Sequence, residues 1–230
     1  LRADPVTRDM LVLMLTATPI QNRLWDIYSL VDLLTVARGH ENPFGNEGMF
    51  ARRFIAGSTV EEALQAVAAM RRRRLTFTLD LLGEATITET EAQRNQEDYF
   101  RLIEGLGPIV NAWPAVPLID QSPDGPLPRV NVSIKLSGLY SQFDPIDPAG
   151  TARAVGERLR PILRSARRHG AFVNVDMEQY AFKDLTLHLF QSILEEAEFR
   201  DWPHVGIAIQ AYLQDVETDL YQLAAWARRR

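Results

Sequence analysis

From residue 75 onward, short apolar runs alternate four times with longer segments of helical periodicity, and this alternation limits the possible folds most strongly. The predicted strands span 75–82, 130–136, 171–175 and 205–211, and a predicted helix follows each one. Such alternation requires parallel strands joined by helical crossovers. A barrel and an open doubly wound sheet both satisfy it. Because no GxGxxG turn or GxxxxGK[ST] loop follows any strand, the nucleotide signatures of open sheets are missing, and we predict an α/β fold built as a partial (βα) barrel.

Capping residues predict where the first helices begin. Ser58 with Glu61 fits a capping box in front of an amphipathic segment, and Thr88 with Glu91 fits a second one. The second helix is predicted to end near residues 105–107, where glycines occur.

Proline and glycine punctuate the remainder of the chain. Residues 112–129 hold five prolines and are predicted to be loop or extended chain. Asp147 followed by Pro148 fits the start of a helix, and Gly170 fits its end. A further helix is predicted over about 182–199, and another follows the strand at 205–211.

Composition excludes several classes of site. The chain has 230 residues, no cysteine, four scattered histidines and a net charge of -5. Disulfides, zinc-thiolate centres and cysteine nucleophiles are therefore excluded, no metal site is predicted, and a broad nucleic-acid surface is disfavoured. No apolar run approaches the ~20 residues of a membrane helix, and no signal segment opens the chain, so we predict a cytoplasmic protein.

Polar residues occur where each predicted strand ends, which is where α/β barrels carry their chemistry. The first strand ends with Asp80 and Glu84, the second with Lys135 and Ser137, the third with Asp176 and Glu178, and the fourth with Gln210 and Tyr212. Each could be a helix cap, a surface charge or a structural ion pair. Lys135 is the most informative, because an ammonium between Ile134 and Leu136 needs a charged partner.

Five ordered segments resemble proline dehydrogenases. They are FIAG at 54–57, TLDLLGEA at 78–85, SIKLSGL at 133–139, NVDME at 174–178 and IAIQAY at 207–212. The resemblance covers about residues 53–230 and is greatest to the bifunctional bacterial enzymes that carry a second dehydrogenase. This predicts two regions, 1–52 and the N-terminal half of a proline dehydrogenase barrel at 53–230.

The resemblance implies a function and roles for particular residues. The family holds FAD in a distorted barrel, oxidises L-proline to 1-pyrroline-5-carboxylate, and passes the electrons to a quinone, which implies peripheral association with the inner membrane. By the motifs, Lys135, Asp176 and Glu84 are the expected catalytic residues. Asp176 and Gln210 are the expected FAD-binding residues. Glu84 is expected in a gate that pairs with a substrate-binding arginine.

About four of the eight strand-helix units of such a barrel are represented. The family's later Arg-Leu-Val-Lys-Gly motif and its paired arginines that bind the proline carboxylate do not occur here. We therefore expect a truncated chain that is inactive alone and that has open strand edges. A complementing C-terminal half or self-association would be needed to cover those edges.

The first 54 residues resemble a different family. LTATPIQN at 15–22 and LWDIYSLV at 24–31 are similar to the strand and helix around motif III of Swi/Snf-type helicase-like ATPases. The phosphate-binding loop and the magnesium ligands are missing, so an autonomous motor is excluded. A join near 52–54 indicates a fusion or chimaera. Two alternatives stay open, a fragment of a DNA-dependent ATPase and a non-catalytic α/β module.

Overall fold

The computed structural model describes residues 56–81, 86–123 and 125–230, which form an α/β fold around one parallel sheet. Its strands are β1 (Leu79–Asp80), β4 (Val130–Lys135), β5 (Ala171–Asp176) and β6 (Val205–Ile207), and they lie in the order β1-β4-β5-β6. Every neighbouring pair is parallel, as the alternation predicted. The strand and helix predicted before residue 35 lie outside the described residues.

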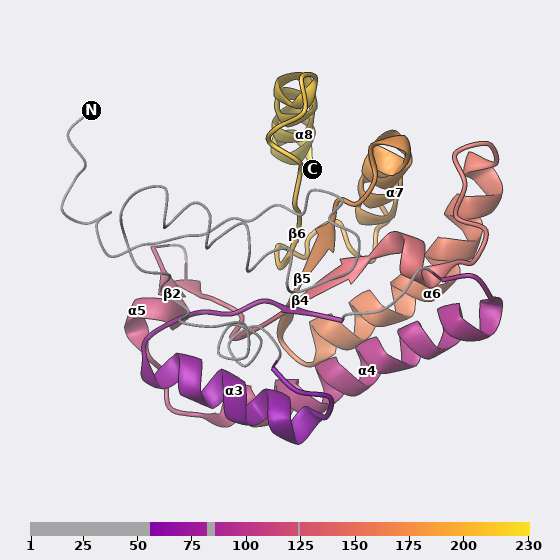
Figure 1. The fold of residues 1–230 in the computed structure, drawn as a ribbon. Helices are drawn as coiled ribbons and strands as arrows, with labels where there is room; N and C mark the ends of the chain where they lie inside the picture. The colour runs from indigo at the N-terminus through magenta and orange to yellow at the C-terminus, as the bar shows by residue number, and fades with distance from the viewer. Residues whose placement is uncertain (1–55, 82–85, 124) are drawn as a thin grey trace, which may run out of the picture.

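One long helix precedes β1, and another follows each strand of the parallel sheet. They are α3 (Val60–Arg72), α4 (Glu89–Ala112), α6 (Pro148–Arg168), α7 (Lys183–Leu194) and α8 (Val216–Arg229). Shorter elements are α5 (Pro117–Asp120), the 3-10 turns η2 (Leu136–Leu139) and η3 (Tyr180–Phe182), and the antiparallel pair β2 (Gln121–Ser122) and β3 (Gly125–Pro126). In Figure 1 the helices α4, α6, α7 and α8 fan out around the sheet, with α3 alongside α4.

The first capping box lies one residue later than predicted. Thr59, not Ser58, is the N-cap of α3, and its side chain accepts a hydrogen bond from the Glu62 backbone N–H at 3.2 Å. The Glu62 carboxylate in turn accepts from the Ser58 N–H at 2.7 Å. Two adjacent hydroxyl residues gave equivalent capping patterns, and the sequence could not separate them.

The capping box at Thr88 and Glu91 is confirmed, but α4 continues to Ala112, past the glycines predicted to end it. Those glycines mark close packing instead. A Cβ on Gly105 would lie 2.7 Å from a Val60 methyl of α3, and one on Gly107 would lie 2.8 Å from the His169 Cβ. Small residues let the helices approach, which a pattern of single letters does not distinguish from a C-cap.

The later boundaries agree better with the predictions. Asp147 caps α6 with Pro148 in its first turn, and Gly170 follows the helix with a φ of 62°. Strands β1 and β6 are shorter than predicted, and α7 ends at Leu194. As a result Gln210 lies in the loop after β6 and not within a strand.

The two faces of the central strands differ sharply. Val130, Val132 and Ile134 of β4 and Ala171, Val173 and Val175 of β5 are buried against the helices. Burial of each larger side chain contributes about 1.5–3 kcal/mol. The alternate positions are Asn131, Ser133 and Lys135, which pair in register with Phe172, Asn174 and Asp176. One face therefore forms the core, and the other presents mostly polar side chains.

Candidate functional site

A lysine between two aspartates lies at the carboxyl ends of β1, β4 and β5. Lys135 and Asp176 are register partners, and Asp80 pairs with Ser133, so parallel pairing brings the three strand ends together. The Lys135 ammonium donates a hydrogen bond to Asp80 and lies 3.9 Å from the Asp176 carboxylate. The prediction that Lys135 requires a charged partner is confirmed, and it has two.

The next turn of chain adds a third carboxylate, that of Glu178. The Ser137 hydroxyl donates to Glu178 at 2.7 Å, and the Ser137 backbone N–H donates to the same carboxylate at 3.3 Å. Burial raises the pKa of Glu178 in spite of these donors. Burial also raises the pKa of Asp176, although the nearby Lys135 charge opposes the shift. The site thus holds two acidic groups that bind protons more readily than an exposed carboxyl does.

Gln210 reaches this region from the loop after β6. Its side chain is buried, and its amide nitrogen donates to the backbone carbonyls of Glu178 at 2.5 Å and Met177 at 3.4 Å. The structure therefore joins Gln210 to the Glu178 segment. Tyr212, the other polar residue predicted here, is exposed, and Glu84 lies outside the described residues.

Asp80 and Glu178 were noted as polar residues at strand ends but were not predicted as site residues. The signal that could have identified Asp80 is Lys135 itself, because a half-buried ammonium implies a carboxylate on a neighbouring strand. Glu178 offered only its place two residues beyond Asp176.

Tyr99 of α4 contacts the end of β4 that carries Lys135. Its buried hydroxyl oxygen accepts the Lys135 backbone N–H at 3.2 Å. Burial raises the pKa of Tyr99, and nearby carboxylates add to the shift. The hydroxyl thus stays protonated and fixes the strand end that carries the lysine.

Beside the polar face, the Phe172 ring packs closely against Gly206 of β6. A Cβ on Gly206 would come within 3.0 Å of the Phe172 ring and 3.7 Å of the Asn174 amide oxygen. The face therefore offers an aromatic ring, amide groups and a cationic donor in one place. Such a set of donors and acceptors suits a planar heterocycle with carbonyl and ring-nitrogen groups.

A second charged cluster lies at the amino ends of the strands. The Arg71 guanidinium donates to both oxygens of Asp120 at 2.8 and 2.7 Å, and the Arg129 Nε lies 3.4 Å from the same carboxylate. The Val116 N–H is a further donor at 2.7 Å. The hydrogen bonds from Arg71 hold the pKa of Asp120 below its usual range. This cluster attaches the proline-rich segment to α3.

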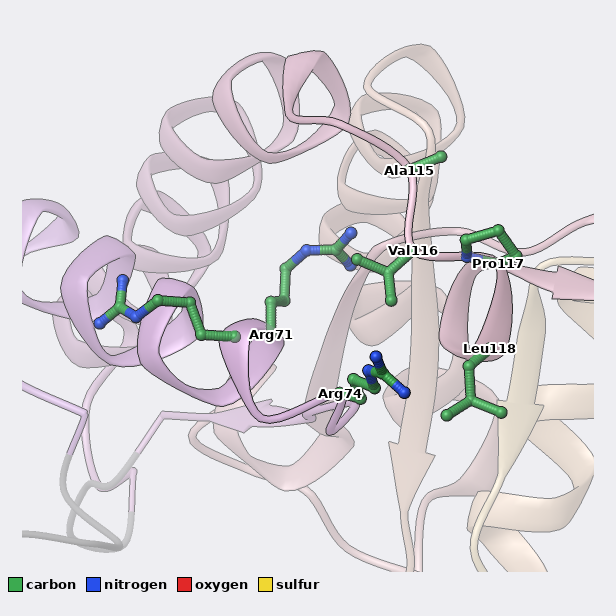
Figure 2. Close-up of a pocket in the computed structure, with 7 residues that line it drawn as sticks. Arg71, Arg74, Ala115, Val116, Pro117 and Leu118 are labelled. Carbon is green, nitrogen blue, oxygen red and sulfur yellow. The ribbon is translucent and has the colours of Figure 1, made fainter.

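A pocket of about 520 Å³ adjoins this amino-terminal cluster. Figure 2 shows the Arg71 guanidinium turned toward Val116, with Arg74 opposite Leu118. The pocket lies at the end of β4 opposite Lys135, because its lining residue Arg71 shares Asp120 with Arg129, which directly precedes that strand. We place the candidate site at the carboxyl edge, where titratable groups converge, and not at this pocket.

Among the described residues, no cluster of three or more His, Asp or Glu is arranged to hold a metal ion. In the same part of the chain, no helix combines the length and apolar character needed to cross a membrane.

Comparison with known proteins gives a consistent result. A family model described as "Proline dehydrogenase" matches residues 63–230. The proline dehydrogenase of Deinococcus radiodurans is 32% identical over 169 residues, covering 71% of this chain and 45% of that protein. The bifunctional protein PutA of Escherichia coli K12 is 27% identical over 185 residues, covering 79% of this chain and 13% of that protein.

A solved structure is also similar. It is proline utilization A (PutA) from Bdellovibrio bacteriovorus inactivated by N-propargylglycine, with a TM-score of 0.77 and 41% identity. The alignment covers 80% of this chain and 19% of that one. The chain thus spans less than half the length of each of these relatives.

Proposed function

The chain belongs to the proline dehydrogenase family, and from this membership we propose that it supplies the first part of a site that oxidises L-proline to 1-pyrroline-5-carboxylate in proline catabolism. The observation that carries the proposal is the cluster of Asp80, Lys135 and Asp176 at the carboxyl ends of three parallel strands. In α/β barrels this is the edge where substrates and cofactors bind.

The cofactor in this proposal is FAD, which accepts the two electrons that leave proline. The polar face suits its ring, because Lys135 supplies a cationic donor and the same face carries the amides of Asn131 and Asn174. Gln210 would bond the ring, and Asp176 would fix the local charge. Glu84 stays a proposed gate residue, on the strength of its motif alone.

Two carboxyl groups in the site suit the proton chemistry of this reaction. The ring nitrogen of proline is a protonated secondary amine in solution and must lose a proton before the adjacent C–H bond can be oxidised. The raised pKa values of Asp176 and Glu178 make both better proton acceptors near neutral pH than exposed carboxylates. In our proposal one of them takes this proton and becomes neutral, while Lys135 stays paired with Asp80.

We further propose that β1, β4, β5 and β6 are four strands of an eight-stranded barrel whose interior is lined by the polar face. The matched part covers only 13–45% of the curated relatives described above. Residues beyond that part would complete the site and bind the proline carboxylate. They would come from a longer polypeptide or from a separate complementing segment. A quinone acceptor and peripheral membrane contact belong to the same proposal.

Residues 1–52 carry no proposed activity. Their likeness to Swi/Snf-type ATPases, and the fusion it would imply, rest on their motifs alone. The family match begins at residue 63, and the described residues 56–81, 86–123 and 125–230 offer no observation that favours a DNA-dependent ATPase.

The test is the visible absorption spectrum after incubation with FAD and removal of free flavin. The chain is measured alone and together with the C-terminal part of the barrel from the Bdellovibrio bacteriovorus relative. We expect weak flavin retention alone, and retention with bleaching by L-proline in the mixture. A mixture that retains flavin without any bleaching by L-proline would contradict the proposed reaction.

A further inference from the structure

Lys183 is a buried ammonium among three carboxylates, outside the site described above. Its side chain is 8% exposed and lies 2.7 Å from Asp219, 3.2 Å from Asp215 and 3.1 Å from Asp184. Burial alone would lower the pKa of Lys183, but the hydrogen bonds to these carboxylates outweigh it and the net shift is upward. The ammonium is therefore charged throughout the physiological pH range.

Helix stability does not explain this lysine. Lys183 is the first residue of α7, which has no side-chain cap. A cation at a helix N-terminus opposes the macrodipole, which favours negative charge there. The lysine is better explained by its partners Asp215 and Asp219 at the start of α8.

The contacts around Lys183 join two segments that both carry site residues. Lys183 lies five residues after Glu178, and Asp215 lies five residues after Gln210. At the end where Lys183 meets Asp215, the Tyr180 hydroxyl also donates a hydrogen bond to Asp215 at 3.2 Å. At the other end, the Gln210 amide donates to the Glu178 carbonyl at 2.5 Å. The two loops are thus fastened at both ends.

We propose that Lys183 is a positioning residue that holds the loop carrying Glu178 against the loop carrying Gln210. The chemical role of these loops rests on the proposed function, whereas the fastening itself does not. Without the ammonium, Asp184, Asp215 and Asp219 lose their shared counter-charge and repel one another. The two loops then separate, and Gln210 loses its hold on the Glu178 backbone.

Another ion pair in the same chain provides a matched control. Arg160 of α6 forms bonds of 2.8–3.0 Å to Glu196 after α7, so it also ties helices together across 36 residues. Both partners are about a third exposed, and neither belongs to the loops that carry Glu178 and Gln210. It is structural without being attached to the site.

The experiment compares Lys183→Met, Asp219→Asn and Arg160→Met by hydrogen exchange in the full 230-residue chain. We expect Lys183→Met to speed exchange about tenfold in peptides covering 177–182 and 208–214, as local opening becomes easier. Asp219→Asn, which keeps a hydrogen-bonding group, should act in the same peptides by less. Lys183→Arg should restore slow exchange, and Arg160→Met should leave both peptides unchanged.

Two results would overturn the proposal. One is uniform acceleration across the chain in Lys183→Met, and the other is exchange at 177–182 and 208–214 no faster than in Arg160→Met. Neither readout needs flavin or proline, so a failure of the proposed reaction is seen separately, in the unmutated protein. In the flavin-retaining mixture, Lys183→Met should also weaken FAD binding about tenfold as preorganisation is lost, with no such loss in Arg160→Met.

Discussion

The amino ends and the carboxyl ends of the parallel strands form two edges of the sheet, and both edges carry paired charges. The pairs differ in how completely their charges are buried and hydrogen-bonded. At the amino edge, Arg71 and Asp120 are 7% and 3% exposed and form a bidentate bond. At the carboxyl edge, Lys135 and Asp80 are 31% and 35% exposed. The first cluster is closed, while the second faces the solvent and has capacity for a further partner.

The direction of the pKa shifts separates the edges as well. Hydrogen bonds from Arg71 lower the pKa of Asp120, whereas burial raises the pKa of Asp176 and Glu178. A lowered carboxyl pKa marks an interaction that stabilises the fold, and a raised one marks a group held at a cost to it. The comparison teaches that ion pairs at strand ends divide into structural and functional ones by burial and by the sign of the shift.

Asp120→Ala should break the structural side of this comparison with the largest effect. Removing one member of a buried pair leaves the Arg71 guanidinium without its counter-charge, at a cost of about 3–5 kcal/mol. Urea unfolding of the variant measures the loss. A cost below about 1 kcal/mol, the range of an exposed pair, would show that the amino edge is not a stabilising cluster.

Asp80→Ala is the matched change at the carboxyl edge. Since its pair with Lys135 is about a third exposed, the expected cost in stability is at most about 1 kcal/mol. Proline-dependent dye reduction in the flavin-retaining mixture should nevertheless fall about 100-fold, because the lysine loses its nearest partner and its position. Equal losses of stability from Asp80→Ala and Asp120→Ala would remove the distinction between the edges.

The pH dependence of stability should have opposite signs at the two edges. The lowered pKa of Asp120 means that its contribution is complete above its ordinary value of 3.8 and is lost as the pH falls through the folded value. The raised pKa of Glu178 means that its charged form costs stability above the folded pKa, and the cost vanishes below 4.5.

Glu178→Gln should therefore stabilise the protein near pH 8 by about the free energy of the pKa shift. Near pH 4 the same substitution should have no effect on stability. Asp120→Asn should destabilise near pH 8 and progressively less below about pH 4. Urea unfolding across this pH range measures both. A stability gain for Glu178→Gln that is unchanged at acid pH would contradict a raised pKa as its cause.

Arg164→Ala gives the smallest expected effect and sets the baseline. Its pair with Glu198, which lies beyond the end of α7, is 49% and 40% exposed, with bonds of 2.6 and 2.8 Å. Such an exposed pair contributes little to stability, because solvent screens it. Thermal unfolding of Arg164→Ala should thus be nearly unchanged, and a loss as large as that of Asp120→Ala would show that burial does not separate these pairs.

Local patterns predicted most of the fold because each depends on residues close in sequence. The parallel strands, the Thr88 capping box and the Asp147 start of α6 follow from such patterns. The glycines in α4 misled the prediction, because their reason is contact with α3 and with the end of α6. That packing depends on residues 45 or more positions away and leaves no local signal.

The site was predictable as a place but only partly as a set of contacts. Lys135 implied a carboxylate, yet its hydrogen-bonded partner Asp80 is 55 residues away and had several equivalent competitors. Tyr99 follows the same helical spacing as plain core residues, so its bond to the Lys135 backbone could not be foreseen. Lys183 resembles an ordinary exposed helix start until α8 brings its aspartates to it.

The most direct test of the account is flavin bleaching by L-proline in the mixture described above, measured for the unmutated chain and for Lys135→Met. We predict that the unmutated chain retains flavin and is bleached by L-proline. Lys135→Met should be bleached at least about 100-fold more slowly, the loss typical of removing one charge-stabilising donor. Equal bleaching rates in the two proteins would contradict the claim that the carboxyl edge is the site of proline oxidation.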